Sequence, residues 1–146
     1  IDVFVPPWAS QFMMIVQVEA KWDGQVPDML MSALSGPNLH VKTVIAVDED
    51  VDIYNAEDVL WAVSCRCDPA QDVFIHPNSR LHPLDVSIPQ VGDEYTVMRI
   101  GGKMGIDATR PPTWRARERE NLSRVDPMGK GDDTVERLLK LVRQQR

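Results

Sequence analysis

Apolar and polar residues follow one another along this chain in blocks that predict alternating strands and helices. Two runs, 12–20 and 41–47, are apolar almost throughout, which is typical of strands covered on both faces. A helix is predicted from Pro27 to Ser35, because proline suits a first turn and the Gly-Pro pair that follows stops it. A second helix is predicted to begin after Asn55, a good N-cap residue, and to end at the Asp-Pro pair 68–69.

Shorter strands are predicted in the second half of the chain. Residues 72–76 are predicted to form a short strand, and the proline-rich stretch 78–90 a loop. Residues 95–100 and 103–109 are predicted to form two strands, with Gly101-Gly102 between them serving a bulge or a close approach of the backbone. This order predicts an α/β fold, a single domain with a mixed, mostly parallel sheet and helices packed on it.

The composition changes in the C-terminal part. Residues 113–131 are rich in Arg, Glu, Pro and Gly, which predicts a surface excursion or linker beyond a core domain that spans 1–112. Residues 132–146 are predicted to form an amphipathic helix that begins with a capping-box-like pair, Asp133 and Glu136. Its apolar positions follow the spacing of a helix face: Val135, Leu138, Leu139 and Val142. The stripe predicts a packed terminal helix, and it could equally dock onto a neighbouring subunit.

Charge and cysteine content exclude several classes of protein. The 146 residues carry a formal net charge of −6 and a pI near 5.0, which argues against a nucleic-acid partner. No apolar run approaches the ~20 residues that span a bilayer, so no membrane partner is expected. Cys65 and Cys67 are too few for a disulfide framework and are expected to be reduced thiols of a cytoplasmic protein. The chain begins with Ile1, which leads us to expect a cut from a longer protein.

Four carboxylates follow the strand 41–47 in a single turn: Asp48, Glu49, Asp50 and Asp52. Carboxylates at the carboxyl end of a parallel strand can hold magnesium, because hard cations prefer oxygen ligands. However, no phosphate-binding glycine-rich sequence precedes the turn, and no Lys or Thr follows at the spacing of a phosphotransfer site. We therefore favour structural roles for this turn: turn formation, helix capping and pairing with Lys or Arg.

The remaining candidate residues do not form a catalytic set. Lys42 precedes a strand, where it is either a solvated strand-end residue or a point charge for a phosphate; the residues alone leave both open. His40, His76 and His82 show no metal-binding spacing, so each is expected to be a loop or edge residue. The chain also has no nucleophile motif and no dinucleotide-binding glycine pattern.

Several segments together resemble the C-terminal domain of the UbiD family of reversible decarboxylases. They occur in the family's order between residues 1 and 112: DVFVPPW, KTVIAVDEDVDIYNAEDVLWAVSCRCDPAQD, HPLD and GGKMGIDATRP. The resemblance implies an enzyme that uses prenylated FMN, with manganese and potassium, to decarboxylate aromatic or α,β-unsaturated carboxylic acids. It also places the catalytic Glu-Arg-Glu set and the metal ligands in a preceding split-barrel domain. No catalytic or metal-binding residue is therefore expected in this chain, and the chain alone is expected to be inactive.

The resemblance assigns roles to two places in the sequence. Lys42 matches a lysine that contacts the flavin phosphate in similar proteins, and His82, Pro83 and Leu84 match a loop that lines the substrate pocket. His82 stands where relatives can carry an apolar residue, which predicts a polar or hydrogen-bonding substrate. The implied partners are a flavin-binding domain or chain, a small carboxylic acid and further copies in a homo-oligomer. Two alternatives remain: a non-catalytic binding or assembly subunit on the same fold, and a magnesium-dependent phosphoryl-transfer domain.

Overall fold

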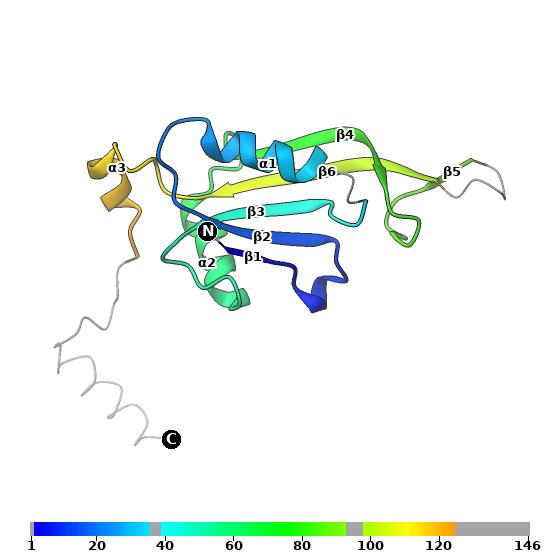
Figure 1. Cartoon of the computed structure of the whole chain (residues 1–146), viewed down its shortest axis with the longest axis horizontal. Coiled ribbons are helices and arrows are strands. Elements are labelled where there is room, and N and C mark those ends of the chain that lie inside the picture. The colour runs from blue at the N-terminus through cyan, green and yellow to red at the C-terminus, as the bar shows by residue number, and fades with distance from the viewer. Residues whose placement is uncertain (1, 36–38, 93–97, 125–146) are drawn as a thin grey trace, which may run out of the picture.

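A computed structural model describes residues 2–35, 39–92 and 98–124 of the chain (Figure 1). The helix predicted over 132–146 and the first residues of the strand predicted over 95–100 lie outside the described residues.

A mixed sheet runs through the middle of the molecule in the strand order β1-β2-β3-β6-β4, and β5 pairs with β6. Strands β2, β3 and β6 are parallel, and β1, β4 and β5 are antiparallel to their neighbours. The bounds are β1 Asp2–Phe4, β2 Met13–Val18, β3 Thr43–Asp48, β4 Val73–Leu81, β5 Gln90–Val91 and β6 Met98–Ala108. The predicted α/β fold with a mixed sheet is confirmed, and its parallel strands form the centre.

Two helices cover opposite faces of this sheet and create two cores. Helix α1 (Gln25–Ser35) packs on alternate residues of β2 and β3, including Val16 and Val44, while α2 (Ala56–Arg66) packs on the residues between them, including Ile15 and Ile45. Successive strand residues point to opposite faces, so a continuous apolar run supplies both cores. The side chain of Asn55 accepts a hydrogen bond from the Glu57 N–H at 3.0 Å, as predicted for the N-cap of α2.

Strand β6 is one continuous element, whereas the sequence predicted two strands. Its first half pairs with β5 and the end of β4, and its second half pairs with β3 and the start of β4. Gly101 lies in the middle, where a side chain would meet Ile88 at 2.9 Å. The predicted close approach is thus present at this glycine, but it does not end the strand.

Strand β4 is longer than the predicted strand 72–76 and extends into the region predicted to be a loop. The pairing with β6 shifts between His76 and Ser79, where Asn78 adopts a positive φ of 56°. Pro77 has no N–H to donate, and an edge strand tolerates such an interruption as a bulge. After this bulge β4 pairs with β6 again from Ser79 onward. The local sequence could not reveal this continuation, because it depends on the length of β6.

Short helices complete the described chain: the 3-10 turn η1 (Pro7–Ala9) after β1, and α3 (Ala116–Asn121) after β6. Because β2, β3 and β6 are parallel, their last residues meet at one edge, the carboxyl edge, and Lys42 lies at the opposite, amino edge. In the ranges described, no helix combines the length and apolar character needed to cross a membrane.

Candidate functional site at the amino edge of the sheet

Lys42 lies immediately before β3, and neighbouring strands fix its backbone. Its N–H donates to the Phe12 carbonyl at 3.0 Å, and its carbonyl accepts from the Met104 N–H at 2.7 Å. The side-chain Nζ lies 2.9 Å from Asp85 Oδ2 and 2.7 Å from Ser87 Oγ, with 27% of the side chain exposed. The ammonium is therefore held in place while one part of it still meets solvent.

Asp85 is the buried partner of this lysine. Its Oδ1 accepts from the backbone N–H of Ser87 at 3.1 Å and from Ser87 Oγ at 2.6 Å. Burial acts to raise the pKa of Asp85, but the hydrogen bonds from Ser87 and Lys42 outweigh it and hold the pKa below the usual value. Asp85 is thus a carboxylate at neutral pH, and its ion pair ties the 82–88 loop to β3.

The 82–88 loop is fastened at two further points. The His82 N–H donates to the Leu39 carbonyl at 3.1 Å, and Arg99 Nε donates to the Pro83 carbonyl at 3.1 Å. A second guanidinium nitrogen of Arg99 donates to the Ile88 carbonyl. Arg99 therefore bridges both ends of the loop from β6.

The ring of His82 is oriented by its neighbours. It stacks on His40 with ring centroids 3.9 Å apart and planes inclined by 21°. Its Nδ1 lies 3.2 Å from the Leu84 N–H and accepts that hydrogen bond. A neutral histidine that accepts at Nδ1 carries its proton on Nε2, so His82 offers a donor there.

An open hollow of about 550 Å³ adjoins these residues and is lined by part of the 7–12 segment together with His40, His82 and Leu84. Phe12 is one of the lining residues, and Lys42 Nζ lies 5.4 Å from the centroid of its ring. The hollow suits a ligand with an anionic group and a flat apolar part. The nearby cation would attract the anionic group, and the imidazole rings and apolar side chains would contact the flat part. Pro83 is positioned by Arg99 and does not line the hollow, whereas Leu84 does.

Arginines neutralise the acidic turn at the opposite, carboxyl edge. Asp48, whose side chain is fully buried, contacts guanidinium nitrogens of Arg66, Arg110 and Arg119 at 3.1 to 3.2 Å. Its Oδ2 also accepts the Arg110 backbone N–H at 2.6 Å. Burial raises the pKa of Asp48, and this hydrogen bond and the three guanidinium groups act in the opposite direction.

The other carboxylates of the turn have similar partners. Arg66 forms two hydrogen bonds to Asp50, at 2.9 and 2.7 Å, and Arg119 binds Glu49 at 2.7 Å. Asp52 accepts the Tyr54 N–H at 3.0 Å within the turn. Across the described ranges, no group of three His, Cys, Asp or Glu side chains is arranged to hold a metal ion. These pairs support the structural roles of the turn over a magnesium site.

Comparison with protein families matches residues 1–108 to the C-terminal domain of the UbiD family, described as 3-octaprenyl-4-hydroxybenzoate carboxy-lyase C-terminal domain. The chain belongs to this family. Three enzymes of known structure, one of them named as UbiD-class, resemble it over 82 to 96% of its length. The chain itself spans only about a quarter of each of them, between 25 and 28%.

The structural matches agree in fold, and two of them are named for different acids. The UbiD-class enzyme HmfF from Pelotomaculum thermopropionicum, solved with FMN, has 28% identity and a TM-score of 0.71 over 92% of this chain. Vanillic acid decarboxylase from Sedimentibacter hydroxybenzoicus has 31% identity and a TM-score of 0.67 over 96% of the chain. The 3,4-dihydroxybenzoic acid decarboxylase from Enterobacter cloacae has 32% identity and a TM-score of 0.62 over 82% of the chain.

The fold brings together residues that the UbiD resemblance singled out. Lys42 and the 82–84 loop lie at one edge, joined through Asp85. Asp85, Ser87 and Arg99 were missed by the sequence reasoning, because a lysine and an aspartate 43 positions apart give no local signal of pairing. His40 was expected to be an ordinary loop or edge residue, and the structure stacks it on His82.

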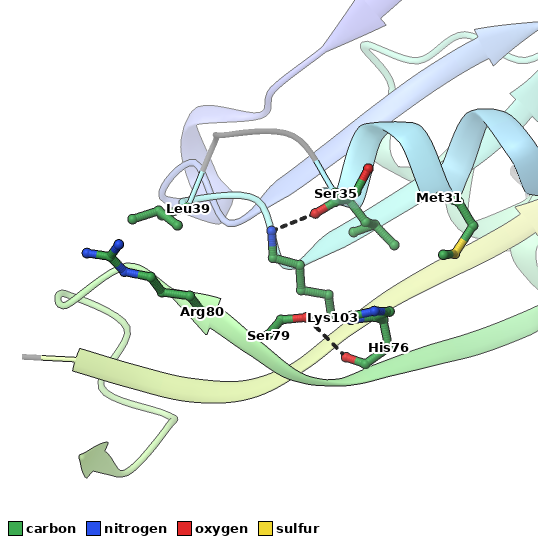
Figure 2. A pocket seen from close by; sticks show the side chains of 8 residues that line it. Met31, Ser35, Leu39, His76, Ser79, Arg80 and Lys103 are labelled. Atoms are coloured by element: carbon green, nitrogen blue, oxygen red, sulfur yellow. Dashed lines mark hydrogen bonds between the residues drawn. The ribbon is translucent and has the colours of Figure 1, made fainter. Parts of the chain in front are cut away.

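A second hollow of this UbiD domain, about 290 Å³, lies between α1 and the β4-β6 pair, and Figure 2 shows the side chains that line it. Lys103 points from β6 toward the end of α1, where its Nζ donates to the Leu34 carbonyl at 2.7 Å. His76 and Ser79 lie beside it on β4, with Nδ1 and Oγ 2.7 Å apart. Burial lowers the pKa of Lys103. A cation at the C-terminal end of a helix satisfies its last carbonyls, so this lysine serves the fold.

Proposed function

We propose that this chain is the C-terminal part of a UbiD-class decarboxylase that acts on aromatic or α,β-unsaturated carboxylic acids. The observation that carries the proposal is the joint arrangement of Lys42, Asp85 and the 82–84 loop beside one hollow. In this arrangement the amino edge faces the flavin-binding domain or chain, and the two together complete the site. We expect the chain alone to be inactive, because the resemblance places the catalytic Glu-Arg-Glu set, and with it the acid and base of the reaction, in the preceding domain.

Lys42 is the residue proposed to bind the cofactor. Its ammonium fits a phosphate group, because it is partly exposed, fixed by Asp85 and Ser87, and close to the hollow. One lysine does not hold a flavin, so the remaining contacts to prenylated FMN would come from outside this chain. When bound, that cofactor supplies the electron sink for loss of carbon dioxide. The role of Lys42 is to fix the phosphate end and so the position of the ring system.

His82 and Leu84 are proposed to contact the substrate, and Pro83 to shape the loop between them. The Nε2–H of His82 can donate to an oxygen of the substrate, while Leu84 supplies apolar contact. Two of the similar enzymes act on vanillic acid and on 3,4-dihydroxybenzoic acid, which carry oxygen substituents on the ring. A substrate of this kind would use the donor that an apolar residue at position 82 would not provide.

The remaining expectations are proposed for the longer protein. Manganese and potassium, where used, would be held by ligands outside the described residues, and a homo-oligomer in the cytoplasm remains our prediction. A non-catalytic binding or assembly subunit is the alternative. It is distinguished by its partner, since a protein of that kind would have no flavin-binding domain or chain.

The proposal is tested by measuring carbon dioxide release from vanillate and from cinnamate by the longer protein that carries this chain, after loading with prenylated FMN. We expect release with the intact protein and its loss when residues 1–146 are removed. In the intact protein, His82→Phe is expected to lower kcat/KM about tenfold for vanillate, the value of a lost hydrogen bond, and less for cinnamate. An activity profile left unchanged across both acids would remove the substrate role of His82.

A further inference from the structure

Asp85 lies between the two parts of the amino-edge site. Its carboxylate pairs with Lys42 Nζ, with the nearer oxygen 2.9 Å away. Its backbone N–H donates to the His82 carbonyl at 3.0 Å. One buried residue therefore links the lysine proposed to bind the cofactor phosphate to the histidine proposed to contact the substrate.

The hydrogen-bonding capacity of the Lys42 ammonium is already used within this chain. Its Nζ lies 3.1 and 2.9 Å from the two carboxylate oxygens of Asp85 and 2.7 Å from Ser87 Oγ. An ammonium has three N–H donors, so a phosphate that approaches the exposed part of Lys42 has to share them with the 82–88 loop. Lys42 and Asp85 together also carry no net charge, and a neutral pair attracts an anion less strongly than a free ammonium does.

Burial keeps this competition in place. The side chain of Asp85 is 4% exposed, against 27% for Lys42, so the carboxylate cannot turn to water when a phosphate approaches. The backbone N–H and the hydroxyl of Ser87 both donate to its Oδ1 and hold it further. A buried carboxylate without its cation is costly, so a phosphate at Lys42 adds to the contact with Asp85 and does not replace it.

We propose that Asp85 is a positioning residue that fixes the His82 loop for the substrate and, by the same contact, weakens phosphate binding at Lys42. The inference rests on the proposed function, which assigns the phosphate to Lys42 and the substrate to His82. It differs from simple support of Lys42 in sign. A residue that only held the lysine in place would strengthen cofactor binding, whereas Asp85 weakens cofactor binding and strengthens substrate binding.

Equilibrium titrations of FMN and of riboflavin into the longer protein that carries this chain measure the effect on the phosphate. Riboflavin lacks the phosphate group, so the ratio of the two Kd values isolates the contact with it. Asp85→Asn is expected to lower the Kd for FMN about threefold or more and to leave that for riboflavin unchanged, because the amide keeps the size of the side chain and removes its charge. Glu118→Gln is the matched control, since it removes a carboxylate that is 63% exposed on α3, and it should change neither Kd.

Binding of vanillate to the same protein loaded with FMN measures the effect on the loop. Asp85→Asn is expected to raise the Kd for vanillate about threefold, because an amide holds the ammonium more weakly than a carboxylate and His82 then offers its donor from a less fixed position. Ser87→Ala is the second variant. It keeps both charges, so the ratio of the FMN and riboflavin Kd values should stay within about twofold of that of the unmodified protein. It removes the hydroxyl that binds both Lys42 and Asp85, so the Kd for vanillate should rise here too.

A lower Kd for FMN together with a higher Kd for vanillate in Asp85→Asn supports the proposal. An unchanged or raised Kd for FMN overturns it, as does an equal change for FMN and riboflavin or an unchanged Kd for vanillate. If Asp85→Asn does not fold, Ser87→Ala decides: a raised Kd for vanillate supports the proposal and an unchanged one overturns it. Failure of the proposed function gives a different result, because Lys42→Ala then leaves the ratio of the FMN and riboflavin Kd values unchanged, which would contradict both.

Discussion

At the scale of single residues, the most constrained charges are those around Asp48. Three arginines from different segments reach this buried carboxylate: Arg66 from α2, Arg110 after β6 and Arg119 from α3. Arg66 is itself fully buried and stacks on Trp61 with its carbon 4.7 Å from the ring centroid. Removing one member of such a network leaves the others buried and less well compensated, so the network holds the carboxyl edge together.

Arg66→Met is expected to lower the free energy of unfolding by about 3 kcal/mol or more, since it leaves Asp48 buried with fewer positive partners. Arg117→Met is the matched control, because Arg117 is exposed on α3, and a change within about 0.5 kcal/mol is expected. Urea denaturation measures both. Similar small losses in the two variants would show that the carboxyl-edge network contributes little.

The pair of Asp50 with Arg66 predicts a dependence of stability on pH. Burial opposes the effect, but the hydrogen bonds and charge of Arg66 lower the pKa of Asp50 below its ordinary 3.8. A group with a depressed folded-state pKa stabilises the protein above its unfolded pKa and loses that contribution as pH falls through the folded pKa. Asp50→Asn is therefore expected to cost about 1–2 kcal/mol at pH 7 and progressively less below about pH 4. A difference that stays constant from pH 7 to pH 2 would contradict this pairing.

At the scale of elements, the sequence pattern predicted the strands and helices whose signals lie close together along the chain. Strand β3 and helix α2 were found from an apolar run and from Asn55, because their signals lie within about ten residues. The continuity of β6 and the extension of β4 through Pro77 depend on each other's hydrogen bonds, so neither segment reveals them alone. The pairing of Lys42 with Asp85 likewise depends on the folded sheet. The candidate residues could be named from the sequence, but the contacts that position them could not.

Gly101 tests how β6 supports the 82–88 loop. Gly101→Ala is expected to destabilise the protein by about 1–3 kcal/mol, because the new Cβ would lie 2.9 Å from Ile88, the last residue of the loop. Gly102→Ala is the neighbouring control: its Cβ would meet only Ile75 at 3.3 Å, and Ile75 is exposed and can move. Chemical denaturation compares the two variants. Equal destabilisation would show that the effect comes from glycine flexibility and not from the contact with Ile88.

At the scale of the whole molecule, the two edges of the parallel strands are built differently. The carboxyl edge, where α/β folds commonly bind ligands, is filled by arginine–carboxylate pairs. The amino edge carries Lys42, the 82–88 loop and the adjoining hollow. The orientation we propose turns the amino edge toward the flavin-binding part of a longer protein. The similar enzymes HmfF and vanillic acid decarboxylase are themselves about four times as long as this chain.

The most direct test of this account is an equilibrium titration of FMN into the longer protein that carries this chain, with Lys42→Ala compared with Lys21→Ala. Lys21 is exposed after β2 and its ammonium lies 4.0 Å from the Glu19 carboxylate, so it controls for the loss of one positive charge. We predict that Lys42→Ala raises the Kd for FMN about tenfold, because a charge-assisted hydrogen bond to phosphate contributes about 1.5 kcal/mol or more. Lys21→Ala should leave the Kd unchanged. Equal FMN affinity in the Lys42→Ala protein and the unmodified protein would contradict the central claim that the amino edge of this domain binds the cofactor phosphate.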